Sequence, residues 1–276
     1  MTEPHQHLFD GAPRLHYLEW NSDAKQTLIL LHGNSANAWW WEAVARAISR
    51  DFRIVALDQR GHGDSEWVQP PAYAPREYAQ DLARFIEHDS QLHGRPIIVG
   101  HSMGGLSVLA YAAKHLDAAR GAIVIDSAIV SSRGRDRYLR RLKSLPVVTY
   151  PDLETAKARY RLMPNEGEIA PEILGTVAEK SLARTDEGRW TLKFDRDSFF
   201  GGDGMNVVEA LAAVTIPTLL VRAENSRIMT VEGLERAAIA NPRAQAVTIP
   251  GAHHHVLLEM PAAVAQVIED FARSLE

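Results

Sequence analysis

The chain contains no cysteine among its 276 residues. Disulfides, thiolate metal sites and cysteine nucleophiles are therefore all excluded. Long apolar runs are absent too, because no stretch approaches the roughly 20 residues that span a bilayer, so we expect no membrane span. Residues 1–11 carry histidine and acidic side chains instead of a basic region followed by an apolar run, so they do not predict a secretory signal. A cytoplasmic protein is the default expectation.

The chain also lacks a positive net charge, since its formal charge at pH 7 is -5. It therefore offers no basic field to a phosphate backbone, and we do not expect a nucleic-acid partner. One local basic cluster, residues 133–143, is interpreted as the solvated face of a helix. Hydrophobic residues make up 46% and charged residues 24%, as in ordinary globular proteins, and the length suits one domain with or without an insertion.

Short apolar runs alternate with segments of helical periodicity along most of the chain. Runs of this kind predict buried strands at 27–31, 53–57, 96–100, 121–125, 218–221 and 246–249. Helical spacing predicts helices at 39–49, 75–92, 104–115, 231–240 and 261–275. Strictly alternating strands and helices are typical of an α/β domain with a mostly parallel sheet covered by helices on both faces.

Residues 131–211 interrupt this alternation. The stretch is rich in Arg, Glu and Pro and contains helical pieces at 152–162 and 171–181. We therefore predict a core formed by residues 1–130 and 212–276, with a helical lid, or cap, inserted at 131–211. Ligands of open α/β sheets bind beyond the carboxyl ends of the strands, so a lid there would shape the substrate pocket.

The strongest chemical signal is Gly100-His101-Ser102-Met103-Gly104-Gly105, between a predicted strand and a predicted helix. Gly-x-Ser-x-Gly in this context is the nucleophile elbow, a strained turn that exposes a serine hydroxyl. Ser102 is the predicted nucleophile. A chance turn is the alternative, and the flanking strand and helix argue against it.

An oxyanion formed at the substrate carbonyl needs two hydrogen-bond donors. The backbone N–H of Met103, at the start of the helix, is the first candidate. The second is the backbone N–H of Asn34, which follows the glycine turn at the end of the strand 27–31. His32 and His101 flank these turns, and we interpret both as structural.

With these motifs in place, the chain resembles the α/β-hydrolase family over nearly its whole length. Asp58-Gln59-Arg60-Gly61-His62-Gly63-Asp64-Ser65 is similar to the family's loop after the fourth strand, and residues 250–255 are similar to its histidine loop. The resemblance implies an eight-stranded core, a lid after the sixth strand, and hydrolysis through an acyl-enzyme without a cofactor. It also implies that Asp58 and Arg60 brace the structure instead of taking part in catalysis.

Three consecutive histidines occupy positions 253 to 255. In the family, the general base is followed five residues later by Glu and then by x-Pro, which here are Glu259 and Pro261. This register selects His254 as the base, and it places His253 where the family usually has glycine. Zinc binding is the alternative for any histidine cluster, but adjacent side chains point in different directions, so we predict no metal site.

The base needs a carboxylate to hold its tautomer and orientation. Ser226 stands where most family members have the acid, and serine carries no charge. Asp126, at the end of the sixth strand, is the predicted acid because that strand end should lie beside the nucleophile. Glu224 is the alternative, on the usual loop but out of register.

Aromatic residues near these motifs are candidates for the substrate pocket. They are Trp39 and Trp40, just after the oxyanion turn, and Phe199 and Phe200 in the predicted lid. The sequence therefore predicts a serine hydrolase for small-molecule carboxylic esters of small or medium acyl chains. C–C bond hydrolysis, a cofactor-free perhydrolase activity, or a non-catalytic ligand-binding homologue remain alternatives. Nothing in the sequence specifies an oligomeric state.

Overall fold

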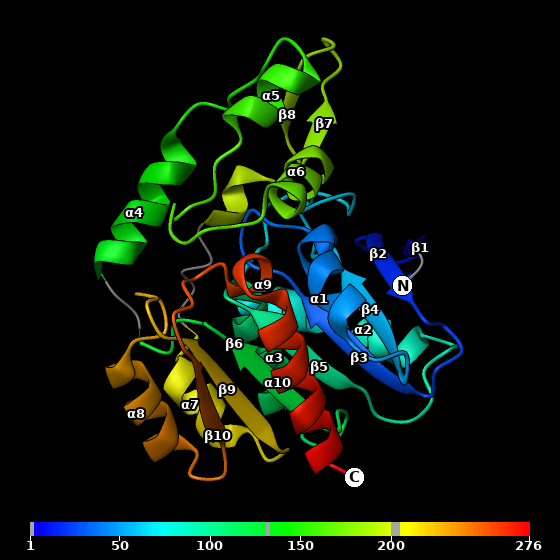
Figure 1. Cartoon of the computed structure of the whole chain (residues 1–276), viewed down its shortest axis with the longest axis vertical. Helices are drawn as coiled ribbons and strands as arrows, with labels where there is room; N and C mark the ends of the chain where they lie inside the picture. Colours follow the sequence, from blue (N-terminus) through cyan, green and yellow to red (C-terminus); the bar gives the residue numbers. More distant parts are fainter. Residues whose placement is uncertain (1–2, 131–132, 200–204) are drawn as a thin grey trace.

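The centre of the molecule is an eight-stranded sheet in the order β1-β2-β4-β3-β5-β6-β9-β10 (Figure 1). The computed structural model describes residues 3–130, 133–199 and 205–276. The strands are β1 (His5–Phe9), β2 (Leu15–Trp20), β3 (Gln26–Leu31), β4 (Phe52–Leu57), β5 (Ile97–His101), β6 (Gly121–Ile125), β9 (Thr218–Ala223) and β10 (Gln245–Ile249). The predicted α/β architecture with an eight-stranded sheet is confirmed.

The sheet is mostly parallel. Pairings from β4 through β3, β5, β6 and β9 to β10 are parallel, whereas β1 with β2 and β2 with β4 are antiparallel. The six predicted strands are the six parallel ones. The sequence does not indicate β1 and β2, because their HQHLF and LHYLEW segments carry polar residues that interrupt an apolar run. Parallel strands buried on both faces give the clearer pattern.

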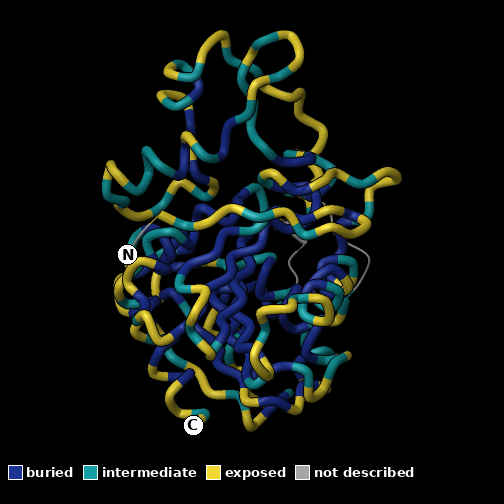
Figure 2. Tube along the Cα trace, turned by 90° about the vertical axis from the view of Figure 1, so that its right-hand side faces the viewer, coloured by how far each residue is buried: buried dark blue, intermediate teal, exposed yellow. Residues whose placement is uncertain are grey.

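Helices cover both faces of the sheet. The first face packs against η1 (Ala38–Trp41), α1 (Glu42–Ala47), α9 (Val256–Glu259) and α10 (Pro261–Ser274). The second face packs against α2 (Pro75–His88), α3 (Met103–Lys114), α7 (Val207–Ala213) and α8 (Val231–Ala240). Successive side chains of β3 alternate between the two layers, with Leu28 and Leu30 on the first face and Ile29 and Leu31 on the second. Figure 2 shows the resulting buried centre.

The described residues 133–199, here named the cap segment, lie above the sheet in Figure 1. The cap segment contains α4 (Arg133–Ser144), α5 (Leu153–Arg159), α6 (Pro171–Lys180), the paired strands β7 (Leu182–Arg184) and β8 (Trp190–Leu192), and η2 (Arg196–Phe199). It follows β6, so it lies on the side where the parallel strands have their carboxyl ends. Arg137, Arg140 and Arg141 on α4 are exposed, which fits the interpretation of a solvated helix face.

The far end of the cap segment is fixed to the loop after β4. The Gly63 N–H donates to the Lys193 carbonyl at 2.8 Å, and the Asp195 N–H donates to the Gly61 carbonyl at 2.7 Å. The Tyr73 hydroxyl also donates to the Asp195 carboxylate at 2.6 Å. The end of the cap segment is therefore held to the loop after β4.

The predicted division at residue 211 falls inside α7. Leu211 and Val214 pack in the second-face core with residues of α3, so the helix belongs structurally to the core. Its short amphipathic pattern resembles that of a cap helix, and the sequence alone does not reveal its partner.

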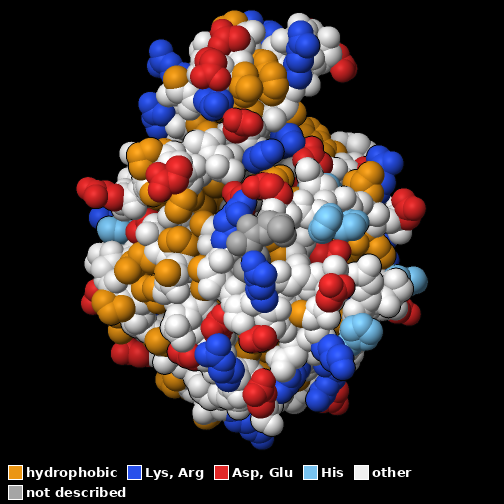
Figure 3. All heavy atoms as spheres, turned by 45° about the vertical axis from the view of Figure 1, so that its right-hand side comes forward, with side chains coloured by type: hydrophobic (Ala, Val, Ile, Leu, Met, Phe, Trp, Pro, Cys, Tyr) orange, Lys and Arg blue, Asp and Glu red, His pale blue; other side chains and the backbone are white. Residues whose placement is uncertain are grey.

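Two further features concern the surface. On the face drawn in Figure 3, Lys and Arg side chains are interspersed with Asp and Glu, so that face has no continuous basic area. Within the described ranges, no helix has the combined length and apolarity needed to cross a bilayer.

Two helical glycines provide a matched test of the packing. A Cβ on Gly104 would lie 2.3 Å from the Leu31 carbonyl oxygen, whereas a Cβ on Gly175 would meet nothing within 4 Å. We predict that Gly104→Ala lowers the free energy of unfolding by about 1–3 kcal/mol through overpacking. Gly175→Ala should instead raise it by up to about 1 kcal/mol, because alanine is the better helix former. Urea denaturation measures both, and equal effects would contradict the packing described here.

Candidate active site

Ser102 lies at the sharp turn between β5 and α3. Its φ of 54° and ψ of -114° are strained for a residue with a side chain. The Ser102 N–H donates to the Ile125 carbonyl at 2.9 Å, and the Ser102 carbonyl accepts from the Ser127 hydroxyl at 2.8 Å. A Cβ on Gly100 would lie 2.2 Å from the Gly104 carbonyl oxygen, so the turn requires glycine there.

His254 is in the loop between β10 and α9, and its imidazole is almost fully buried. His254 Nδ1 lies 2.7 Å from Asp126 Oδ2, across 128 positions of the sequence. The His254 carbonyl accepts a hydrogen bond of 2.8 Å from His101 Nε2, and the two imidazole rings are 4.8 Å apart. Because His101 directly precedes Ser102, this contact brings the histidine loop to the serine turn.

The hydrogen bonds of the described residues do not include one between the Ser102 hydroxyl and His254. Catalytic hydrogen bonds are often long without substrate and shorten in the reacting complex. Proton transfer between these two side chains therefore stays a prediction.

The two candidate acids lie in different surroundings. Asp126 is fully buried, and its carboxylate accepts from the Ser226 hydroxyl at 2.5 Å and from the Ala223 N–H at 3.3 Å, in addition to contacting His254. Glu224 is exposed and accepts from the Gly251 N–H at 2.7 Å. Only Asp126 of the two contacts His254 among the hydrogen bonds of the described residues.

Ser226 has a role that the sequence analysis missed. It occupies the usual position of the acid, and here its hydroxyl donates to Asp126, the predicted acid. Ser226 Oγ also accepts from the Ile228 N–H at 3.0 Å, which fixes the direction of the hydroxyl proton. The only signal in the sequence was the missing carboxylate at position 226.

The residues that carry the two predicted oxyanion donors lie close to the serine, and their side chains contact each other. A Cβ on Gly33 would lie 3.2 Å from the Ser102 Cβ, so the oxyanion turn is in van der Waals contact with the nucleophile. The Asn34 side-chain amide contacts Met103 Sδ at 3.7 Å and donates to the Ser198 carbonyl at 2.8 Å. In the described part of the chain, neither the Asn34 nor the Met103 backbone N–H donates to a protein acceptor. Their binding of an oxyanion stays a prediction.

Three other histidines nearby are held neutral by burial. Burial lowers the pKa of His32 and lowers that of His101 well below its usual value. His255 has a pKa lowered to about 4, mainly by burial, and its Nε2 donates to the Pro164 carbonyl at 2.8 Å. His255 thus connects the histidine loop to the cap segment, a contact that no sequence motif indicated.

The predicted pocket aromatics separate into different environments. Trp39 packs in the first-face core, with the Lys180 amine 4.4 Å from its ring centroid. Trp40 packs beneath the cap segment with Tyr160 and other apolar residues. Phe199 ends η2, directly after Ser198 at the oxyanion turn, and Phe200 lies outside the described residues.

One group among the described residues has the geometry to hold a metal ion, and it comprises His16, Asp58 and Asp64. Its central carboxylate is already engaged: Asp58 accepts from His16 Nδ1 at 2.7 Å, from the Ala38 N–H at 2.6 Å and from the Asp64 N–H at 2.9 Å. These contacts give Asp58 the bracing role that the family resemblance implies. The group does not include His254.

Comparison with known proteins identifies the family. A profile of the alpha/beta hydrolase family matches residues 28–267. The chain belongs to this family.

Relatives within the alpha/beta hydrolase family include enzymes of named activity. One is 2-(acetamidomethylene)succinate hydrolase of Mesorhizobium japonicum, 28% identical over 251 residues, which are 88% of this chain and 87% of that protein. An esterase of Mycobacterium tuberculosis is 25% identical over 268 residues, 91% and 84% of the two chains. A crystal structure of E-2-(acetamidomethylene)succinate hydrolase superposes with a TM-score of 0.83 at 26% identity, covering 98% of this chain and 99% of that one. These relatives support hydrolase activity.

The geometry predicts which acid serves His254. Asp126→Asn should lower kcat/KM for any hydrolysed substrate by about 10³–10⁴-fold, because an amide can hold the imidazole in the wrong tautomer. Glu224→Gln, the matched control, should change kcat/KM by less than about threefold, because Glu224 contacts only the loop backbone. Steady-state kinetics of both variants measure these effects. A large loss in Glu224→Gln with little loss in Asp126→Asn would exclude Asp126 as the acid.

Two buried histidines predict how stability depends on pH. Burial lowers the pKa of His62 to about 3 and that of His255 to about 4, from 6.5 when unfolded. The unfolded chain therefore binds more protons below pH 6.5, and the free energy of unfolding should decrease as the pH falls from about 6.5 toward 4.

Each histidine should contribute up to about 1.4 kcal/mol per pH unit within that window. Urea denaturation at pH 7, 6 and 5 measures the slope, and His255→Gln should make it shallower. An unchanged slope in the variant would show that His255 is not held neutral in the folded protein.

Proposed function

We propose that the protein is a serine hydrolase that cleaves carboxylic esters of small or medium acyl chains through an acyl-enzyme. The observation that carries the proposal is the buried Asp126–His254 hydrogen bond of 2.7 Å beside the strained turn that presents Ser102. A carboxylate on Nδ1 leaves Nε2 of the imidazole as the proton acceptor. Relatives named as hydrolases and esterases agree with this chemistry.

The first half-reaction transfers the acyl group to the protein. Ser102 Oγ attacks the ester carbonyl while His254 Nε2 accepts the hydroxyl proton, and the carbonyl oxygen becomes an oxyanion. The backbone N–H groups of Asn34 and Met103 bind that oxyanion. The C–O bond to the alcohol then breaks, and the imidazolium returns its proton to the leaving oxygen.

The second half-reaction restores the enzyme. His254 takes a proton from water, the hydroxide attacks the acyl carbonyl, and a second tetrahedral intermediate forms in the same oxyanion site. Collapse of this intermediate releases the carboxylic acid and reprotonates Ser102 Oγ. Asp126 stays ionised throughout and stabilises the imidazolium formed in each half.

The preference for small or medium acyl groups is supported by what fills the space around the site. Trp40 is buried in a cluster with Tyr160, Leu162 and Val177 of the cap segment. The cap segment also reaches the oxyanion turn, where the Ser198 carbonyl accepts from Asn34 Nδ2. The Trp40 cluster and the approach of the cap segment to the oxyanion turn favour a short acyl chain over an extended one.

A second candidate reaction is hydrolysis of an acyl compound other than an ester, such as an amide or a compound with a cleavable C–C bond. The Mesorhizobium japonicum relative is named for a substrate that carries an acetamide and two carboxyl groups, and it matches most of this chain. The same triad and oxyanion donors would serve an amide or a C–C bond, with a poorer leaving group.

A panel of p-nitrophenyl esters with acyl chains of two to about sixteen carbons tests the main proposal. We expect turnover to be highest for short and medium chains and to fall by at least about 10⁴-fold in Ser102→Ala. p-Nitroacetanilide in the same assay tests the second candidate, because it has the same acetyl group on an amide nitrogen.

The outcomes are distinct. Turnover that survives in Ser102→Ala with an unchanged circular dichroism spectrum would refute a serine mechanism. Absence of turnover, together with tight binding of the esters, would favour a ligand-binding homologue instead of an enzyme.

A further inference from the structure

Gln59 is a buried residue of the loop after β4, and both ends of its side-chain amide are bound to parts of the candidate active site. Its Nε2 donates to the His32 carbonyl at 2.7 Å, at the end of β3. Its Oε1 accepts from the Ser107 hydroxyl at 2.9 Å, in the second turn of α3. One side chain therefore joins the strand end before Asn34 to the helix that starts with Met103.

The backbone of Gln59 strengthens the same connection. The Gln59 N–H donates to His32 Nε2 at 3.0 Å, and His32 Nδ1 donates to the Gly33 carbonyl at 2.7 Å. The His32 ring is thus neutral and spans the glycine turn, in agreement with the burial that lowers its pKa. Ser107 Oγ is also 3.2 Å from the Met103 carbonyl oxygen, so the chain of contacts reaches the first residue of α3.

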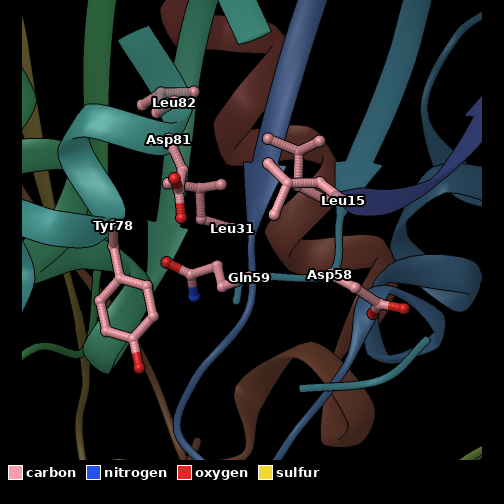
Figure 4. A pocket seen from close by; sticks show the side chains of 8 residues that line it. Leu15, Leu31, Asp58, Gln59, Tyr78, Asp81 and Leu82 are labelled. Atoms are coloured by element: carbon pink, nitrogen blue, oxygen red, sulfur yellow. The ribbon is translucent and has the colours of Figure 1, made fainter. Parts of the chain in front are cut away.

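Gln59 has no room to bind a substrate directly. Its side chain borders a cavity of about 10 Å³ that Asp58 and Tyr78 also line, and Figure 4 shows the Gln59 side chain between these two. Such a volume holds about one water molecule. Gln59 itself is 5% exposed, so any effect on catalysis must pass through the groups that it holds.

We propose that Gln59 is a positioning residue that fixes the separation between the two backbone donors of the oxyanion site, Asn34 and Met103. The inference rests on the proposed function, because it assigns those two N–H groups to the oxyanion. Asn34 and Met103 are 69 positions apart in the sequence, and they belong to different segments of the fold. The chain itself therefore does not fix the distance between their N–H groups. Among the described residues, the amide of Gln59 connects the end of β3 to α3 by hydrogen bonds at both of its ends, in addition to the 3.7 Å contact between the Asn34 amide and Met103 Sδ.

The expected effect follows from the geometry that oxyanion binding needs. Donors stabilise the transition state when they lie about 2.7–3.1 Å from the developing charge, and removing one costs about 10²–10³-fold in kcat. A displacement of about 1 Å far from the reacting atoms can cost about 10²-fold. Loss of the Gln59 contacts should move the donors without removing them, so the loss should be smaller than that of a deleted donor.

The test variant is Gln59→Met, which keeps the approximate volume of the side chain but has no amide. We expect kcat for the best p-nitrophenyl ester to fall about 10- to 100-fold with KM changed by less than about threefold. Inhibition by a trifluoromethyl ketone of the same acyl length, whose adduct carries the oxyanion, should weaken by the same factor as kcat/KM. General destabilisation of the protein would not lower kcat/KM and trifluoromethyl ketone affinity by the same factor.

Asn241 provides the matched control. Its buried side-chain amide donates to the Leu211 and Val214 carbonyls at 3.1 and 3.0 Å, and it joins α8 to α7 away from the oxyanion turn. Asn241→Leu also removes a buried amide, so it should lower the melting temperature but leave kcat and trifluoromethyl ketone affinity within about twofold of the unmodified protein.

The proposal is overturned if folded Gln59→Met retains kcat and trifluoromethyl ketone affinity within twofold. It is also overturned if Asn241→Leu loses both to the same extent, because the loss would then reflect stability alone. Failure of the proposed function is distinguishable, since it would appear as full turnover in Ser102→Ala, or as absence of turnover in the unmodified protein, whatever the behaviour of Gln59→Met.

Discussion

The left-handed backbone at Ser102 is the constraint on which the site depends. A backbone φ of 54° is an unfavourable conformation for a residue with a side chain, so the surrounding structure must hold Ser102 in it. They do so by close approach: without a Cβ, Gly100 can lie against the backbone of α3, and Gly104 can lie against the Leu31 carbonyl. The same approach brings the end of β3 to the start of α3, the two segments that carry the predicted oxyanion donors.

The order of the strands in the sheet explains how the predicted acid can follow β6 instead of β9. β6 and β9 are adjacent parallel strands, so the residues that follow them emerge side by side at the same edge of the sheet. A carboxylate after either strand is therefore near the histidine loop. In this chain Asp126 supplies the carboxylate from β6, and Ser226, after β9, contributes a hydroxyl to it. The arrangement keeps a single buried negative charge with three hydrogen-bonding partners, which limits the cost of desolvation.

The sequence allowed most of the core to be predicted, because buried parallel strands leave continuous apolar runs. It did not reveal β1 and β2, whose polar residues interrupt an apolar run, nor the packing of α7, which depends on a partner distant in sequence. The candidate roles of Ser102 and His254 could be predicted from the sequence, because glycine turns and the spacing to Glu259 are local patterns. The contacts of Gln59 and Ser226 could not be predicted, since both are side-chain hydrogen bonds between segments that only the fold brings together.

Covalent labelling with a fluorophosphonate tests the central claim most directly, because phosphonylation requires an activated hydroxyl and no knowledge of the natural substrate. Peptide mapping after labelling should find one adduct, on Ser102, and the labelling rate should fall by at least about 10²-fold in His254→Gln. An adduct on another residue, or a labelling rate at Ser102 that is unchanged in His254→Gln, would contradict the account.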